Sequence, residues 1–244
     1  MIPKTIHYCW FGRNPLPPLA LDCITSWKKY LPDYEIKEWN EDNFDVNMIP
    51  YTKEAYEQKK YAFVSDYARF WILEKYGGLY FDTDVEVIRP MDDIIANGPF
   101  MGAEDNGKTW TKTYNVAVGL GMGAEPHSKF IQEMMRIYNG LHFEYNPDIK
   151  IMVNIVTYTT QKLTEMGLQN KCEIQRIGEF AIYPHDYFNP INTISGRLHI
   201  TKNTRSIHHY AGSWVKKSGF KAKVRQIFPE WTLLLISKIK HISK

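Results

Sequence analysis

Two pairs of charged residues stand out in the largely apolar segment 61–90. Asp66 and Arg69 are three residues apart, so they would share one face of a helix. Asp82 and Asp84 are two residues apart, so they would point the same way from an extended strand. Buried charges are costly unless they are paired or bind a metal ion. The pattern is compatible with a metal site, although an internal ion pair and an acidic turn would also account for it.

Two predicted elements would position these charges. Residues 61–76 are apolar nearly all round, which predicts a buried helix that Gly77 and Gly78 end through a left-handed conformation. Residues 79–88 are rich in aromatic and β-branched side chains, which predicts a buried strand interrupted by the acidic triplet. Neighbouring carboxylates there would repel each other until a hard divalent cation binds, so losing one of them should relieve repulsion.

The same segment carries a joint motif: Ser65-Asp66-Tyr67-Ala68-Arg69, followed by Tyr76-Gly77-Gly78-Leu79-Tyr80-Phe81-Asp82-Thr83-Asp84. This motif resembles the sugar-binding region of glycosyltransferases that share a DXD motif. The family includes yeast initiating mannosyltransferases and bacterial capsular polysaccharide transferases, and the glucosyltransferase domain of large clostridial toxins is more distantly similar. The resemblance implies a GT-A-like α/β fold, a nucleotide-diphospho-sugar transferase fold formed as a single domain over residues 1–218.

The resemblance also implies roles for individual residues. Asp66, Arg69, Asp82 and Asp84 would be catalytic. The donor would be bound by Trp10, Ser65, Asp66, Arg69, Tyr80, Asp82, Ser213 and Trp214. Trp10 would be a platform for the base, although packing in the core would also account for it.

A metal ion, Mn²⁺ or Mg²⁺, would bind to Asp82, Asp84 and a histidine near the C-terminus. His208 and His209 are adjacent in a predicted strand, so only one of them can face a given site. The resemblance favours His209 as the ligand. His208 would then lie in the core or contact the metal ligands without binding the metal itself.

The resemblance implies a retaining, metal-dependent hexosyltransferase. The acceptor would be a hydroxyl of a polysaccharide or of a lipid-linked oligosaccharide, in the synthesis of a bacterial capsule or surface polysaccharide. Trp10 and the toxin-like helix favour a UDP-hexose donor. Two alternatives stay open, namely a GDP-mannose-dependent mannosyltransferase and a non-catalytic module that binds a nucleotide sugar.

Composition separates a mildly acidic body from a basic tail. The chain has 244 residues and a formal net charge of +3, which suits one sizeable core. From residue 216 onward there are eight Lys or Arg and one acid. Residues 219–244 are predicted to form a basic amphipathic helical tail, which would either meet anionic lipid at a membrane surface or pack on the domain. An acidic body with a cluster of basic residues in one short tail argues against a nucleic-acid partner.

Other sequence features exclude several classes of protein. Cys9, Cys23 and Cys172 lack metal-ligand spacing, which argues against a disulfide framework and a structural zinc site. No G-x-G-x-x-G follows the first strand, which argues against a dinucleotide cofactor. No signal-type or membrane-spanning apolar run is found, so we expect a cytoplasmic protein, with possible peripheral contact at the inner face of the cell membrane.

The remaining expected elements complete an α/β pattern. Strands are expected over 2–11, 34–39, 99–103, 115–123, 173–177 and 181–184, and helices over 19–30, 52–60, 126–139 and 151–166. Thr52 is expected to cap its helix. Glu104, at a strand end, would serve acceptor binding or charge stabilisation, or belong to an ordinary acidic turn. Asn115 and Asn154 are further candidates for contact with a sugar.

Overall fold

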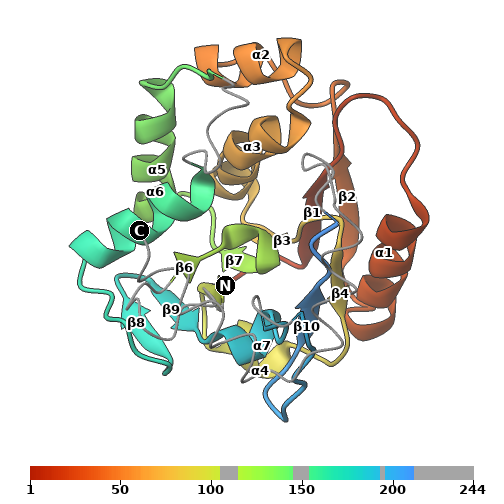
Figure 1. Cartoon of the computed structure of the whole chain (residues 1–244), viewed down its shortest axis with the longest axis vertical. Helices are drawn as coiled ribbons and strands as arrows, with labels where there is room; N and C mark the ends of the chain where they lie inside the picture. The colour runs from red at the N-terminus through yellow and green to blue at the C-terminus, as the bar shows by residue number, and fades with distance from the viewer. Residues whose placement is uncertain (105–114, 145–153, 193–195, 212–244) are drawn as a thin grey trace, which may run out of the picture.

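The computed structural model describes residues 1–104, 115–144, 154–192 and 196–211 (Figure 1). In chain order the elements are β1 (Thr5–Cys9), α1 (Pro18–Tyr30), β2 (Glu35–Trp39), α2 (Pro50–Glu57), α3 (Tyr61–Tyr76), β3 (Gly78–Tyr80), β4 (Val85–Val87), α4 (Asp92–Ala96), β5 (Phe100–Glu104), β6 (Asn115–Val116), a 3₁₀ turn (Val118–Leu120), β7 (Met122–Ala124), α5 (Lys129–Asn139), α6 (Ile155–Glu165), β8 (Gln175–Ile177), β9 (Phe180–Tyr183), α7 (His185–Phe188) and β10 (Ser206–His208). Within these ranges no helix is long and apolar enough to cross a membrane.

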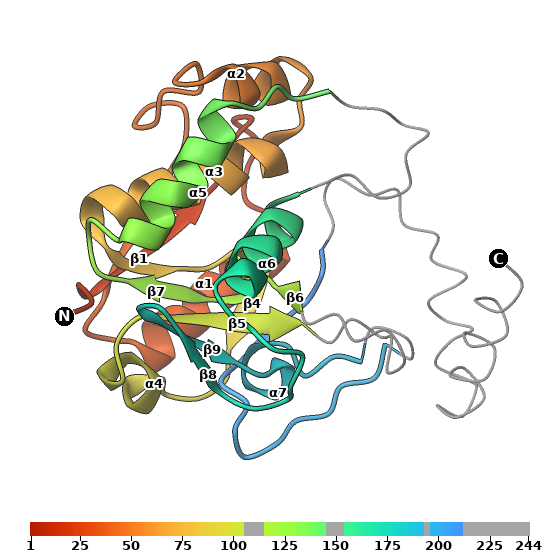
Figure 2. The ribbon, with the colours of Figure 1, turned by 90° about the vertical axis from the view of Figure 1, so that its left-hand side faces the viewer.

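The strands form a mixed sheet in the order β2-β1-β3-β7-β5-β9-β8, with β6 paired to β5. β1 runs parallel to β2 and β3, and β5 runs parallel to β9. Helices α2, α3 and α5 lie on one face of the sheet, while α1, α4 and α7 lie on the other (Figure 2). The expected α/β architecture is therefore confirmed, with helices on both sides of a sheet rich in parallel pairs.

Each face of the sheet has its own apolar core, and β1 contributes to both. Ile6 and Tyr8 pack with Trp27 of α1 in one core, whereas Cys9 packs with the residues of α3 in the other. Successive side chains of a strand point to opposite faces, so a strand covered on both sides must be apolar at nearly every position.

Helix α3 has the predicted bounds and is buried along most of its length. It ends at Gly77, where φ is +63° and the N–H donates to the carbonyl oxygen of Leu73. Gly78 follows with φ +97°, and a Cβ there would lie 2.6 Å from the carbonyl oxygen of Thr5. Both the left-handed conformation and the close approach to β1 require glycine, so the chain passes directly from α3 into β3.

The strand predicted over 79–88 is interrupted at the acidic triplet, as expected, but its two halves join different sheets. β3 belongs to the central sheet, whereas β4 pairs antiparallel with β10 in a separate two-stranded sheet, visible side by side in Figure 1. Between them the chain turns at the acidic triplet, where the Val85 N–H donates to the carbonyl oxygen of Asp82 at 3.1 Å. The Asp82 N–H itself donates to the carbonyl oxygen of Gly119 at 3.0 Å, which fixes the start of the turn.

Three other predicted boundaries differ in the structure, each because of a local interaction or backbone conformation. Thr52 lies inside α2 rather than at its start, and its hydroxyl donates to the carbonyl oxygen of Ile49. The strand expected over 115–123 is divided into β6, the 3₁₀ turn and β7, and Gly121 adopts φ +151° at the second break. Helix α5 begins only at residue 129, because the Ser128 hydroxyl accepts the N–H of Ile131.

The tail predicted over 219–244 lies outside the described residues. So do residues 151–153 of the expected helix 151–166, which is seen as α6. The proposed boundary at residue 218 therefore stays a prediction.

A buried histidine ties three elements together and makes stability depend on pH. His7 Nδ1 accepts the indole N–H of Trp39 at 3.0 Å, and its Nε2–H donates to the carbonyl oxygen of Gly77 at 3.1 Å. Burial lowers the pKa of His7 to about 4. An unfolded chain binds this proton near pH 6.5, so between those values protonation favours unfolding and stability falls as the pH falls.

We therefore expect acidification from pH 7 to pH 4 to cost on the order of 3 kcal/mol at His7. Urea unfolding across this range should show that loss, and His7→Gln should flatten the slope because glutamine does not titrate. Carboxylates also titrate in the lower part of the range, so the comparison of the two chains is decisive. An identical slope in both chains would contradict the assignment.

Candidate active site

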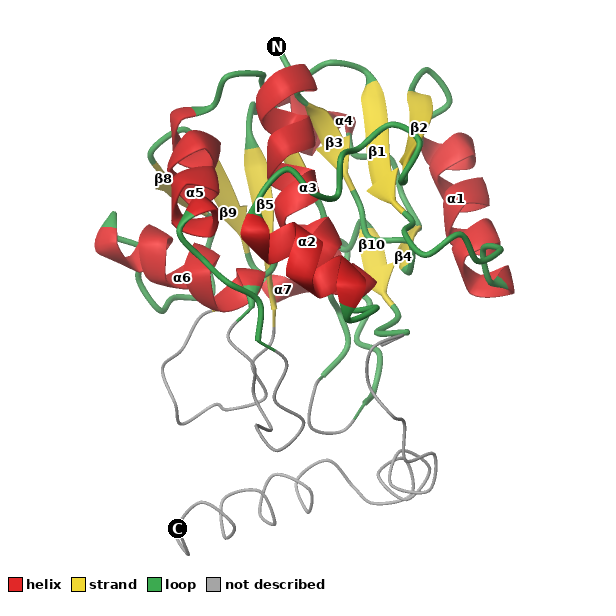
Figure 3. Cartoon of the chain, turned by 90° about the horizontal axis from the view of Figure 1, so that it is seen from above, coloured by secondary structure: helices red, strands yellow, loops and turns green. Residues whose placement is uncertain are grey.

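The acidic turn follows the carboxyl end of β3, on the side of the molecule where β5 of the same sheet and β10 of the two-stranded sheet also end (Figure 3). There, ligand atoms of Asp82, Asp84 and His208 all lie within 4.8 Å of one another. They form the one such metal-binding constellation among the described residues. Two carboxylates and an imidazole are a donor set that suits Mn²⁺ or a similar divalent cation.

The structure reverses the expected choice of histidine. His208 Nε2 lies 3.0 Å from Asp84 Oδ1, whereas His209 Nε2 lies 2.9 Å from Glu86 Oε2. The two rings do point to opposite faces, as the strand geometry requires. His208 is opposite Val85 in the β4–β10 pair, and Asp84, in the turn just before β4, directs its carboxylate to His208. That contact could not be read from the sequence.

Asp84 is held by the segment that carries His208. The Ala211 N–H donates to Asp84 Oδ2 at 2.7 Å, and the His209 N–H donates to the Asp84 carbonyl oxygen at 2.9 Å. Burial alone would raise the pKa of Asp84, but the hydrogen bond and charge of His208 and the Ala211 N–H outweigh it and lower the pKa. The same carboxylate raises the pKa of His208 against the effect of burial. Each group therefore stabilises the charged form of the other.

Arg69 joins the helix to the turn. One guanidinium nitrogen lies 3.2 Å from Asp66 Oδ1 and 3.2 Å from Asp82 Oδ1, and the Nε–H donates to the carbonyl oxygen of Ser65 at 3.0 Å. The guanidinium also lies 4.8 Å from the centre of the Tyr80 ring. The side chains of Arg69 and Asp66 are only 5% and 10% exposed, so their pairing is well shielded from water, whereas that of Asp82 is 30% exposed. The structure thus brings together five residues that the motif predicted.

Asp66 is the most deeply buried acid of this group. Burial raises its pKa to about 7, and the charge of Arg69 and the N–H of Ile155 oppose that rise only in part. Ile155 is the first residue of α6, so the positive end of that helix is directed at the site. Asp66 is therefore held by charges from two helices.

Each carboxylate of the turn already has a cation partner, which the sequence did not reveal. Arg69 pairs with Asp82, and His208 pairs with Asp84. The repulsion expected between the two carboxylates is thus offset before any metal binds. A fourth acid, Glu104, ends β5 and interacts electrostatically with His208 and Asp82. Burial raises the pKa of Glu104. The site thus contains four acidic side chains, together with the Arg69 guanidinium and the His208 imidazole.

The other predicted site residues lie in varied settings. The Trp10 indole N–H donates to the carbonyl oxygen of Asn14, and the ring packs against the core on the α1 side of the sheet. Ser213 and Trp214 lie outside the described residues. Asn115 is opposite Glu104 in the β5–β6 pair. Asn154 is the N-cap of α6, where its side-chain oxygen accepts two backbone N–H groups, so it is engaged in holding that helix.

Four residues near the acidic centre were not identified from the motif: Glu104, Gly119, Asn189 and Tyr210. Of these, only Glu104 was considered from the sequence, as one of two alternatives. Their signals were a carboxylate at a strand end, a glycine in an apolar run, and polar residues near the two histidines. Each signal is common in proteins, and only the fold brings these residues to one place.

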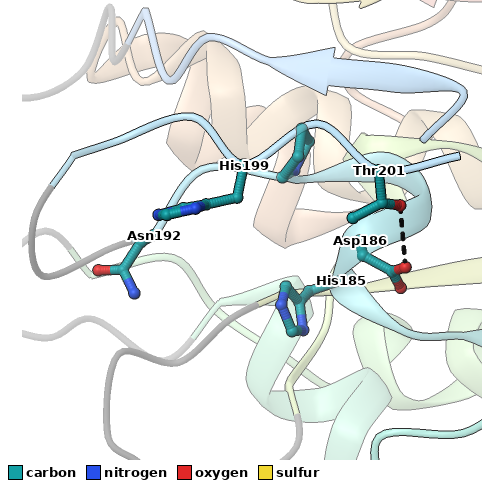
Figure 4. Close-up of a pocket in the computed structure, with 6 residues that line it drawn as sticks. His185, Asp186, Asn192, His199 and Thr201 are labelled. Carbon is teal, nitrogen blue, oxygen red and sulfur yellow. Dashed lines mark hydrogen bonds between the residues drawn. The ribbon is translucent and has the colours of Figure 1, made fainter. Parts of the chain in front are cut away.

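A polar hollow lies beside α7, at the end of β9. Figure 4 shows its lining side chains, which come from α7 and from the segment 190–201. They are His185, Asp186, Pro190, Asn192, His199 and Thr201. The Thr201 hydroxyl donates to Asp186 Oδ2 at 3.2 Å, which fastens this segment to the helix. The hollow is distinct from the acidic centre, and its histidines and aspartate do not form a metal-binding group.

Comparison with known proteins confirms the resemblance of the motif region. Residues 17–101 match the family described as "Glycosyltransferase sugar-binding region containing DXD motif". Inositol phosphoceramide mannosyltransferase 3 of Schizosaccharomyces pombe is 33% identical over 98 residues, which is 38% of this chain and 27% of that protein. Inositol phosphoceramide mannosyltransferase 1 of the same yeast is 27% identical over 111 residues, which is 41% of this chain and 33% of that protein.

The chain thus spans between about a quarter and a third of the length of these curated relatives. Among solved structures, the PaToxG glycosyltransferase aligns with a TM-score of 0.49 at 15% identity, covering 68% of this chain and 72% of that one. The matched family segment includes α3 and the acidic turn and ends before β10, so the place of His208 rests on the geometry described above.

Proposed function

We propose that this chain is a metal-dependent glycosyltransferase that moves a hexose from a nucleotide sugar to an acceptor hydroxyl. The observation that carries the proposal is the convergence of Asp82, Asp84 and His208 next to the Arg69–Asp66 pair, inside a DXD sugar-binding segment. A cation site beside a buried guanidinium and carboxylate suits a ligand with a diphosphate at one end and sugar hydroxyls at the other. The names of the two yeast relatives, both mannosyltransferases, agree with transfer of a sugar.

The proposed mechanism assigns a task to each group of residues. Asp82, Asp84 and His208 would hold Mn²⁺ or Mg²⁺, which when bound offsets the diphosphate charge and improves the leaving group. Asp66 and Arg69 would orient the sugar hydroxyls, and fixed orientation lowers the entropic part of the barrier. The bond from the anomeric carbon to the phosphate oxygen breaks, the acceptor oxygen bonds the same face, and the departing phosphate takes the hydroxyl proton. The configuration is then retained without a covalent nucleophile.

The identity of the donor sugar is a separate part of the proposal. The expected base platform at Trp10 favours a UDP-hexose, whereas the two yeast relatives are named as mannosyltransferases, which favours GDP-mannose. A panel of nucleotide sugars should therefore be screened with and without Mn²⁺ for a rise in melting temperature, because a ligand that binds only the native state stabilises it. The same panel should be incubated with simple glycoside acceptors to detect transfer. Stabilisation without transfer or donor hydrolysis would favour the non-catalytic binding module.

The two adjacent histidines provide a matched test of the metal site. His208→Ala should weaken Mn²⁺-dependent donor binding by roughly 10- to 100-fold, since it removes one of three ligands. His209→Ala should leave that binding nearly unchanged, because His209 pairs with Glu86 at 31% exposure. Isothermal titration of Mn²⁺ and donor checks both variants. Greater loss in His209→Ala would overturn the assignment.

The acceptor and the location of the protein extend the proposal further. A hydroxyl of a polysaccharide or a lipid-linked oligosaccharide, in capsule or surface polysaccharide synthesis, is the acceptor that the motif family favours. A basic tail over 219–244 would bring the protein to an anionic membrane surface from the cytoplasmic side. Sedimentation with anionic vesicles at low salt, and release at high salt, would support this location. The absence of vesicle binding at low salt would count against it.

A further inference from the structure

Tyr210 has an unusual backbone conformation next to the acidic centre. Its φ is +48°, in the left-handed region that a tyrosine rarely occupies. This single residue separates His208 and His209 from Ala211, whose N–H donates to Asp84 Oδ2. Strained backbone of this kind persists where the surrounding contacts hold it, and it concentrates at functional sites.

Because of the left-handed conformation at Tyr210, the short segment 208–211 contacts Asp84 at three points. His208 Nε2 meets Oδ1 at 3.0 Å, the Ala211 N–H meets Oδ2 at 2.7 Å, and the His209 N–H meets the backbone oxygen at 2.9 Å. The right-handed or extended conformations usual for tyrosine would direct the chain after residue 210 elsewhere, away from Oδ2.

The Tyr210 side chain holds this turn from outside. Its ring meets the His208 imidazole edge-on, with centroids 4.3 Å apart and an interplanar angle of 62°. Its hydroxyl donates to Glu104 Oε1 at 3.3 Å and accepts from the Asn189 amide. Asn189 is fully buried, so this anchor is rigid. The imidazole thus lies between the tyrosine ring and Asp84.

We infer that Tyr210 is a positioning residue that forms the cation site in advance of any ligand. Its left-handed backbone aims Ala211 at Asp84, and its anchored ring presses the imidazole toward the same carboxylate. Partners that orient metal ligands commonly change metal affinity by roughly 10- to 100-fold when they are removed. This inference rests on the proposed metal site and adds that the site is complete without the donor.

The test is a titration of the full chain with Mn²⁺ in the absence of a nucleotide sugar. The electron paramagnetic resonance signal of free Mn²⁺ measures how much of the ion is bound. The unaltered chain should bind one ion per molecule. Tyr210→Phe keeps the ring and loses the anchor, so affinity should fall about 10-fold. Tyr210→Asn tolerates the left-handed backbone but loses both ring and anchor, so affinity should fall further. Tyr34→Phe, a half-buried tyrosine just before β2 at the opposite edge of the sheet, should match the unaltered chain.

A double variant separates positioning from general destabilisation. Glu104→Ala removes the acceptor of the tyrosine hydroxyl, so Tyr210→Phe should cost much less in that background than in the unaltered chain. Melting temperatures measured beside the titrations should not follow the order of the Mn²⁺ affinities. Unchanged affinity in Tyr210→Phe, or independent effects in the double variant, would overturn the inference.

The unaltered chain also tests the inference against the proposed function. Binding of Mn²⁺ only after UDP-hexose or GDP-mannose is added would refute the preformed site and leave the metal-dependent transferase standing. A lack of Mn²⁺ binding under both conditions would refute the inference and the proposed metal site together.

Discussion

Replacing Asp84 with asparagine should reduce sugar transfer by roughly three orders of magnitude, because a cation at a departing phosphate supplies several kcal/mol of charge stabilisation. Asparagine has nearly the same shape and can still accept the Ala211 N–H, so the change removes mainly charge. Mn²⁺ affinity should fall with the rate. Initial rates at saturating donor, measured with titrations of Mn²⁺, check this expectation, and near-normal transfer by Asp84→Asn in Mn²⁺ would exclude the turn as the cation site.

The same variant tests how the metal-free site is stabilised. Asp84 is half-buried, with 14% of its side chain exposed, and it is hydrogen-bonded to His208 and to a backbone N–H. Losing its charge leaves the half-buried imidazole of His208 without its charged partner, which should cost about 1–3 kcal/mol of unfolding free energy. Urea unfolding without metal measures this cost. A more stable Asp84→Asn would instead show that repulsion between Asp82 and Asp84 dominates, as the sequence alone suggested.

Local patterns predicted the parts of this molecule that do not depend on distant partners. Helix α3 shows the expected bounds because apolar residues cover it nearly all round and two glycines follow it. β1 was evident as an apolar run, since a strand buried on both faces needs one. Asp66 and Arg69 do share a helix face, because a three-residue step fixes that geometry.

Long-range pairing decided what the sequence left uncertain. The side-chain contact between Asp84 and His208 favours His208 over His209, and these two residues are far apart in the chain. The acidic triplet became a turn because β3 and β4 join different sheets. Glu104 and Tyr210 meet at 3.3 Å although 106 positions separate them. Propensity and periodicity describe neighbours along the chain, so such contacts were outside their reach.

Gly119 provides the second large effect that we expect. A Cβ at this position would lie 2.0 Å from Asp82 Oδ2 and 2.9 Å from an Arg69 nitrogen. Its φ lies outside the left-handed region, so alanine there would be strained by contact and not by its backbone. Because Gly119 has no side chain, the Asp82–Arg69 pair can lie directly against its backbone.

Gly119→Ala should move the Asp82 carboxylate out of the cation site, because the 3₁₀ turn that carries residue 119 is buried and hydrogen-bonded to the Asp82 N–H. We expect Mn²⁺ affinity and transfer to fall at least about 10-fold, and overpacking to cost about 1–3 kcal/mol of stability. Gly140→Ala is the matched control, since the nearest atom to a Cβ there is 3.7 Å away. Removing the obstructing carboxylate, in Asp82→Ala with Gly119→Ala, should recover stability without recovering activity. Mn²⁺ affinity, transfer rate and urea unfolding should be measured for the unaltered chain, the two single glycine variants and the double variant. A Gly119→Ala chain that binds Mn²⁺ as tightly as Gly140→Ala would show that Asp82 does not need this space.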